Sequence, residues 1–189
     1  MKTALIIVDG QIDFCEGGKL GVVGGNRVAR AIAALLSTNP SMFDLIVTTQ
    51  DWHIDPGSHF SDTPDYVDSW PYHCLASTTG AMLHPEIEAA LYTRDDVISI
   101  RKGHYSDAYS GFQGVTKDDR PLAEVLREKG VTHLVIVGIA TDHCVKATAL
   151  DGVREGFNVT IGTDLCAGVD ADMSRNAVEA MSLAGCEII

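Results

Sequence analysis

Short apolar runs alternate along this chain with segments in which apolar residues recur at helical spacing. The runs are continuous and rich in Val, Ile and Leu, which is typical of strands buried on both faces of a parallel sheet. We predict strands at residues 5–8, 45–49, 97–100, 134–137 and 159–161. We predict helices at residues 26–36, 121–129, 145–155 and 172–184. The alternation of the two patterns indicates an α/β fold with a mainly parallel sheet.

The ends of the predicted helices carry residues that commonly start or stop a helix. Gly130 and Gly156 each follow a predicted helix as a C-terminal cap, and Pro121 stands where a helix begins. The stretch from Asp51 to about His84 is different, because it shows no sustained period and holds four of the seven histidines. So long an irregular segment within a compact domain is usually functional.

Composition narrows the class of protein. With 189 residues and 46% hydrophobic content, the chain is expected to form one domain, residues 1–189. A formal net charge of -12, without a cluster of Lys or Arg, argues against nucleic acid or anionic lipid as partners and favours a small-molecule substrate. Asp9 interrupts the first apolar run too early for a signal peptide or membrane span, so we expect a cytoplasmic protein.

Polar residues follow each predicted strand, at the edge where parallel sheets bind their ligands. They are Asp9; Asp51 and His53; Arg101 and Lys102; Thr141, Asp142, His143 and Cys144; and Asp164. Five cysteines at irregular spacing, without a CxxC pair, argue against a disulfide framework or a Cys-rich zinc module. The sequence therefore brings acids, a base, histidines and a thiol to one edge of the sheet.

Cys144 falls near the first turn of a predicted helix, where the helix dipole and free amides favour a thiolate and can hold an oxyanion. Asp9 is a candidate base for the thiol proton, and the charge of Lys102 would lower the pKa of the thiol. The alternative is that Cys144 is a small buried hydrophobe and the two charged residues are solvated strand ends.

Asp51 and His53 lie on the same side of an extended segment, and His59 and His73 follow in the irregular stretch. One carboxylate with three imidazoles suits Zn²⁺, Fe²⁺ or Mn²⁺ better than Ca²⁺ or Mg²⁺. The alternative is that these histidines are polar groups on the surface. Four aromatic residues near the same segments are candidates to clamp a flat ring, although most aromatic residues fill cores: Phe14, Trp70, Tyr105 and Tyr109.

Taken together, these segments resemble the nicotinamidase/pyrazinamidase branch of the isochorismatase-like cysteine hydrolases. The resemblance runs over residues 4–187. It is carried by residues 5–9 (LIIVD), 13–18 (DFCEGG), 51–60 (DWHIDPGSHF), 69–74 (SWPYHC), 102–103 (KG), 108–112 (AYSGF) and 137–144 (VGIATDHC). Gly10 and Ile12 depart from the Val and Asn expected in the first motif, and the acid before them, Asp9, matches it.

The resemblance implies a three-layer α/β/α fold and a set of roles for residues of this chain. The implied catalytic triad is Asp9, Lys102 and Cys144. The implied metal ligands are Asp51, His53, His59 and His73, holding one divalent ion, Zn, Fe or Mn. The Ala140 and Cys144 amides would form the oxyanion hole, next to a cis peptide at Ile139–Ala140. Ile139 and His143 would join the aromatic residues in contact with the substrate.

The implied reaction converts nicotinamide and water to nicotinate and ammonia through a Cys thioester, with pyrazinamide as a second substrate. Three alternatives stay open at this point. The protein could be a sister amidase or isochorismatase-like hydrolase of the same superfamily, a metal-water hydrolase with an inert Cys144, or a metal-binding module without activity. The sequence does not decide between a monomer and a homo-oligomer.

Overall fold

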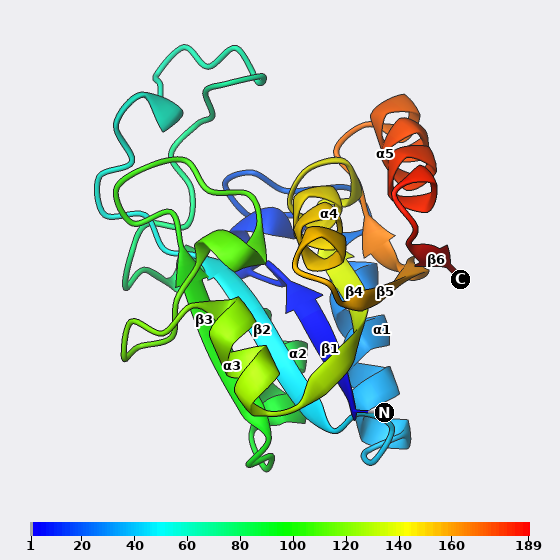
Figure 1. The fold of residues 1–189 in the computed structure, drawn as a ribbon. Coiled ribbons are helices and arrows are strands. Elements are labelled where there is room, and N and C mark those ends of the chain that lie inside the picture. The colour runs from blue at the N-terminus through cyan, green and yellow to red at the C-terminus, as the bar shows by residue number, and fades with distance from the viewer. Residues whose placement is uncertain (1) are drawn as a thin grey trace.

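The protein folds around one parallel sheet of six strands, shown in Figure 1. The computed structural model describes residues 2–189. The strands are β1 (Lys2–Val8), β2 (Leu45–Asp51), β3 (Val97–Lys102), β4 (Val131–Ile139), β5 (Asn158–Ala167) and β6 (Glu187–Ile188). The helices are α1 (Gly25–Thr38), α2 (Pro85–Leu91), α3 (Leu122–Glu128), α4 (Lys146–Arg154) and α5 (Ala171–Leu183).

The strand order is β3-β2-β1-β4-β5-β6, so the chain winds outward from β1 in one direction and from β4 in the other. β1 pairs with β2 through Ile7↔Thr48 and with β4 through Val8↔Gly138. The order therefore reverses between the two central strands. In open α/β sheets, a crevice forms at this point beyond the carboxyl ends of the strands, and ligands bind there.

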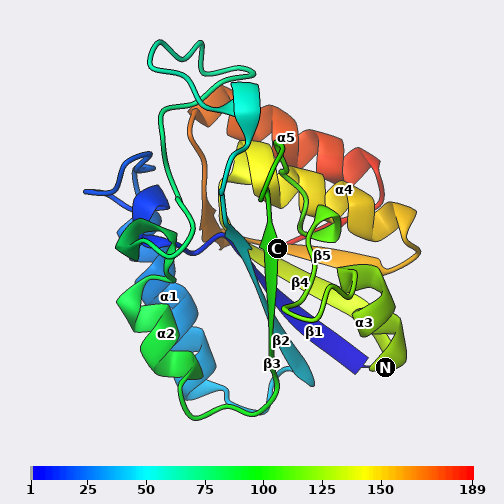
Figure 2. The same ribbon diagram turned by 90° about the vertical axis from the view of Figure 1, so that its left-hand side faces the viewer.

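Helices cover both faces of the sheet, which confirms the three-layer α/β/α prediction (Figure 2). On one face, Leu122 and Leu126 of α3, Ala149 of α4 and Met181 of α5 pack on the sheet. On the other face, Ile32 of α1 and Ile87 of α2 pack on it with their neighbours. Alternate residues of β1 belong to the two cores, which explains why the strand sequences read as unbroken apolar runs.

Two elements were absent from the sequence prediction. The seven-residue helix α2 begins at Pro85 and is too short to show a clear period, and β6 has only two residues. The observed strands also extend beyond the apolar runs, because β3 includes Arg101 and Lys102 and β5 continues to Ala167. Gly130 and Gly156 have positive φ, as the helix-cap prediction requires.

The stretch between β2 and α2 lies beyond the carboxyl edge of the sheet, where its loops project at the upper left of Figure 1. It contains two short 3₁₀ turns, Gly57–His59 and Thr79–Ala81. Isolated bridges between His53 and Leu75 and between Phe60 and Trp70 tie the stretch to itself. Among residues 2–189, no helix has the length and apolar character needed to cross a bilayer.

Candidate active site

The site begins with a buried lysine at the carboxyl end of β3. Nζ of Lys102 lies 2.9 Å from Oδ2 of Asp9 and 2.5 Å from Oδ1 of Asp51. It also lies 3.8 Å from Sγ of Cys144 and donates to the Ala108 carbonyl at 3.0 Å. Lys102 is 1% exposed and Asp9 is fully buried. The three residues of the predicted triad therefore meet in the structure, around one ammonium group.

Burial and charge set the protonation of this group. Burial would lower the pKa of Lys102, but Asp51 and Asp9 raise it well above 10.5. Burial would raise the pKa of Asp51, but Lys102, His53 and His73 hold it well below 3.8. Burial raises the pKa of Asp9, with Lys102 opposing. Lys102 and Asp51 are therefore both charged at neutral pH, whereas Asp9 is the carboxylate suited to exchange a proton.

The thiol of Cys144 lies on the turn that follows β4. Burial raises the pKa of Cys144 well above 9.0, and Lys102 opposes the rise. Residues Thr141–Val145 form a π-helical turn before α4, in which the Ala140 carbonyl accepts the amides of His143 and Val145. The peptide between Ile139 and Ala140 is cis. Cys144 is thus a neutral thiol at a helix start, beside a carboxylate able to take its proton.

A close approach of β1 and β4 brings Asp9 and the Cys144 turn together. Gly138 has φ of 122°, and a Cβ on it would lie 2.1 Å from the Val8 carbonyl oxygen. Asp9 itself has φ of 45° and is held by Thr49, whose hydroxyl donates to Oδ1 of Asp9 at 2.6 Å. Backbone strain of this kind in a non-glycine residue is often found at functional sites.

Three buried histidines lie next to the lysine cluster. Nitrogens of His53, His59 and His73 lie within 4.8 Å of one another. Oδ2 of Asp51 lies 3.5 Å from Nε2 of His53 and 3.6 Å from Nε2 of His73. The four predicted metal ligands are therefore brought together, and Asp51 joins the histidines to Lys102.

The hydrogen bonds of these histidines leave nitrogen lone pairs free for a metal. Nδ1 of His53 contacts the Gly103 carbonyl at 2.6 Å, and Nδ1 of His73 contacts the Pro71 carbonyl at 2.7 Å. A carbonyl only accepts, so both Nδ1 atoms carry the proton and both Nε2 atoms have lone pairs. Burial lowers the pKa of His59 to about 4, which keeps it neutral. These residues fit a divalent transition metal ion.

A pocket lies over Cys144, between the β4 turn and the stretch that carries the histidines. We call it the inner pocket. Its lining includes Asp51, His59, His73 and Cys144 together with five of the predicted substrate contacts: Phe14, Trp70, Tyr109, Ile139 and His143. Nε1 of Trp70 donates to the Tyr109 hydroxyl at 3.0 Å, which fixes both rings. The pocket thus combines aromatic and apolar lining residues with the thiol and two of the histidines.

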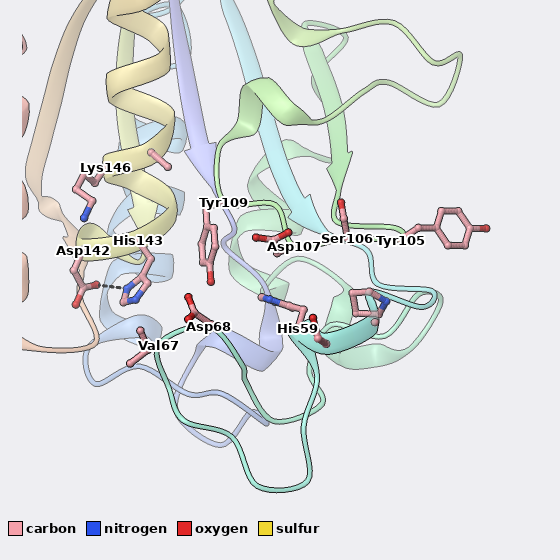
Figure 3. Close-up of a pocket in the computed structure, with 14 residues that line it drawn as sticks. His59, Val67, Asp68, Tyr105, Ser106, Asp107, Tyr109, Asp142, His143 and Lys146 are labelled. Carbon is pink, nitrogen blue, oxygen red and sulfur yellow. Dashed lines mark ion pairs between the residues drawn. The ribbon is translucent and has the colours of Figure 1, made fainter.

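A wider cleft opens outside the inner pocket, and the two share His59, Tyr109 and His143 (Figure 3). We call it the outer cleft. The sixth predicted substrate contact, Tyr105, lines only this cleft. Its side chain is 71% exposed, and Figure 3 shows its ring pointing away from the cleft. The structure therefore corrects the prediction for Tyr105, whose neighbourhood in sequence to Lys102 does not bring it to the inner pocket.

Two strand-end candidates also lie elsewhere. Asp164 does not follow β5 but lies inside it, because the strand continues three residues further, and its side chain is exposed. Arg101 points away from Lys102, since neighbours on a strand face opposite sides, and its guanidinium stacks over Trp52 at 3.6 Å. Sequence reasoning missed Leu20, Val22 and Val169 in the inner pocket wall. Leu20 and Val22 lie in a glycine-rich segment without a helical or strand period, so the sequence gives only a weak signal for them.

Comparison with known proteins gives the family. The model of the isochorismatase domain matches residues 3–189. The chain belongs to the isochorismatase family. A nicotinamidase/pyrazinamidase of Mycobacterium tuberculosis is 49% identical over 191 residues, which cover 98% of this chain and 97% of that protein. The chain is therefore a hydrolase of this family and lies close to members that act on nicotinamide.

Solved structures agree with this assignment to the isochorismatase family. The pyrazinamidase of Pyrococcus horikoshii in complex with zinc is 34% identical, with a TM-score of 0.84 over 100% of this chain and 99% of that chain. A protein of L. infantum in complex with nicotinate is also 34% identical, with a TM-score of 0.84 over 100% of this chain and 92% of that chain. The family therefore includes relatives of the same fold that bind zinc or nicotinate.

Proposed function

We propose that this protein is a nicotinamide amidohydrolase, which converts nicotinamide and water to nicotinate and ammonia and also hydrolyses pyrazinamide to pyrazinoate. The observation that carries the proposal is the meeting of Asp9 and Lys102 with Cys144, which lines the inner pocket together with residues of the histidine cluster. The similarity to nicotinamidases over nearly the whole chain supports the same substrate.

The substrate ring is expected to bind in the inner pocket. Phe14 and Trp70 are 8% and 4% exposed and supply apolar surface, while Ile139, Tyr109 and His143 complete the wall. Cys144 lines the same pocket, so a ring held there can present its carboxamide to the thiol. Pyrazinamide differs from nicotinamide by one ring nitrogen in place of carbon and fits the same walls.

Asp51, His53, His59 and His73 would hold one divalent ion, Zn²⁺, Fe²⁺ or Mn²⁺. A bound ion would supply a Lewis acid that attracts the pyridine nitrogen of the substrate and so helps to anchor the ring. The remaining chemistry belongs to side chains and amides of the chain.

In the first half of the reaction, Asp9 takes the proton of the Cys144 thiol and the sulfur attacks the carboxamide carbon. The raised pKa of Asp9 makes its ionised form a stronger base. The amides of Ala140 and Cys144 are assigned to the oxyanion, and loss of one such donor typically costs about 3 kcal/mol. Asp9 then returns the proton to the nitrogen, the C–N bond breaks and ammonia leaves.

In the second half, Asp9 takes a proton from water, and the hydroxide attacks the thioester carbon. The C–S bond breaks, Cys144 regains its proton and nicotinate is released. Lys102 stays charged throughout, because Asp9 and Asp51 raise its pKa well above 10.5. It therefore balances the charge that moves between Asp9 and the sulfur.

The deciding experiment is ammonia release from nicotinamide by metal-loaded protein, with Cys144→Ala beside it. Wild-type protein should release ammonia, and Cys144→Ala should lose at least about 10³-fold in kcat, because the nucleophile is gone. Cys166→Ala is the matched control. Cys166 is also buried, at 6% exposure, but does not line the inner pocket, so this variant should keep the activity of the wild type.

Each part of the proposal has its own contrary outcome. No ammonia from a folded, metal-loaded wild type would exclude nicotinamide as the substrate. An active Cys144→Ala variant would exclude the thioester mechanism but keep the substrate. A cytoplasmic location and a single domain over residues 1–189 stay predictions, to be checked by cell fractionation and by limited proteolysis.

A further inference from the structure

Gln11 is a fully buried polar residue to which the proposed reaction gives no role. Its side-chain amide pairs with the backbone of Asp51: Nε2 donates to the Asp51 carbonyl at 2.8 Å, and Oε1 accepts the Asp51 amide at 2.9 Å. Both backbone groups of one residue are therefore satisfied by a single side chain.

The topology explains why Asp51 needs this partner. β1 pairs with β2 only as far as Ile7↔Thr48, whereas β2 continues to Asp51. On the side of β1, the backbone of Asp51 thus extends past the end of the neighbouring strand. The Gln11 amide takes the place that the next peptide of a strand would occupy, and a buried backbone group left without a partner would be costly.

Gln11 is itself held on two sides. Its own backbone amide donates to the Asp9 carbonyl at 2.7 Å. Nε2 also donates to the Ala81 carbonyl at 2.9 Å, which ties it to the loop before α2. Gln11 therefore links the residue proposed as base, Asp9, to the residue whose carboxylate contacts both Lys102 and the histidines.

We propose that Gln11 is a positioning residue, which fixes the backbone of Asp51 and thereby aims its carboxylate at the metal site and at Lys102. The inference rests on the proposed metal site. Gln11 is not one of the four proposed metal ligands, so it would act through Asp51. Removal of residues that orient metal ligands typically weakens metal affinity roughly 10–100-fold.

The test compares Gln11→Met with Gln50→Met. Methionine keeps the length of glutamine and removes its hydrogen bonds. Gln50 is a matched control, because it is also buried and donates to the Ala81 carbonyl at 2.8 Å, but its side chain does not pair with Asp51. The readouts are the affinity for Co²⁺, measured in competition with a chelator, and the visible spectrum of the bound Co²⁺.

We expect Gln11→Met to bind Co²⁺ roughly 10–100-fold more weakly, with a changed spectrum, because the carboxylate ligand is no longer held. Gln50→Met should match the wild type in both readouts. Equal affinity and spectra in all three proteins would overturn the role of Gln11 and leave the proposed function standing. A wild type that does not bind Co²⁺ would overturn the metal site and this inference together.

A second variant keeps the test decisive if Gln11→Met does not fold. Gln11→Glu retains an oxygen that accepts the Asp51 amide but lacks both donor hydrogens when ionised. Weaker Co²⁺ binding with a changed spectrum supports the inference, and wild-type binding overturns it.

Discussion

Lys102 is the residue that joins the two halves of the site, since its ammonium contacts Asp9, Asp51 and the sulfur of Cys144. A buried cation is expensive to desolvate, and the two carboxylates compensate for this. The same carboxylates would be strongly unfavourable without it. The charge of this one side chain therefore affects both folding and chemistry.

Replacement of Lys102 by Met should destabilise the fold by about 3–5 kcal/mol at pH 7, because two buried carboxylates lose their common partner. Urea unfolding measures this directly. The loss should shrink in acid, where the carboxylates take up protons. Lys117→Met is the control: Lys117 is exposed, and its loss should change stability by less than about 0.5 kcal/mol. Equal stability of the two variants would contradict the assigned charge balance.

The pH dependence of activity should report Asp9. Burial raises the pKa of Asp9 above 3.8, and Asp9 accepts a proton only when ionised. Activity should therefore fall as pH decreases through the raised value, so the acid limb of kcat/KM lies above 3.8. The profile is recorded at saturating metal, with the Co²⁺ spectrum showing that the ion stays bound. A midpoint at or below 3.8 would assign the base to another group.

At the scale of residues, the sequence predicted the side chains to which we assign direct roles, but it gave no sign of Gln11, to which we assign a role through the backbone. Asp9, Asp51 and Cys144 each follow an apolar run, and that position is visible in one dimension. Gln11 pairs with Asp51 from 40 positions away. No local pattern marks such a partner, because the pairing arises only where β2 continues past the end of its neighbour β1 in the folded sheet.

At the scale of elements, the ends of β1 and β4 set the geometry of the site. The sequence located both strands, but not the contact between them at Gly138. Apolar runs specify which residues are buried. The close approach of the two backbones instead depends on Gly138, which has no side chain to keep them apart. The π-helical turn at Thr141–Val145 was likewise unseen, because its sequence is equally compatible with an ordinary helix start.

Gly138→Ala should separate these strands. Its Cβ would meet the Val8 carbonyl at 2.1 Å, and φ of 122° is strained for alanine. We expect a loss of more than about 1 kcal/mol in unfolding free energy and a fall in kcat, because Asp9 and the Cys144 turn move apart. Gly162→Ala is the control, since its Cβ would meet only side-chain methyls, of Val137 at 3.1 Å and of Leu165 at 4.0 Å. Equal effects of the two substitutions on kcat would contradict the argument.

At the scale of the whole molecule, the metal site should contribute to stability, because it connects β2 to the long stretch that follows it. An ion that binds only the folded state at 100 times its Kd adds about 2.7 kcal/mol. Chelation should therefore lower Tm by roughly 5–10 °C, and added Zn²⁺ should restore it. In calorimetry, the His59→Ala variant should show a smaller Tm difference between metal-loaded and chelated protein than the wild type does. Identical Tm values for treated and untreated wild type would argue against a metal bound in the fold.

The charges that line the outer cleft bear on substrate entry and product release. Three carboxylates line it, those of Asp68, Asp107 and Asp142, with one ammonium, that of Lys146, on a protein whose formal charge is -12. Nicotinamide is neutral, whereas nicotinate carries a negative charge, so the acidic outer cleft and the negative net charge should disfavour the return of the product more than the entry of the substrate. The proposed hydrolysis would thus convert a neutral substrate into an anionic product, and the negative charge of the protein would favour release of that product.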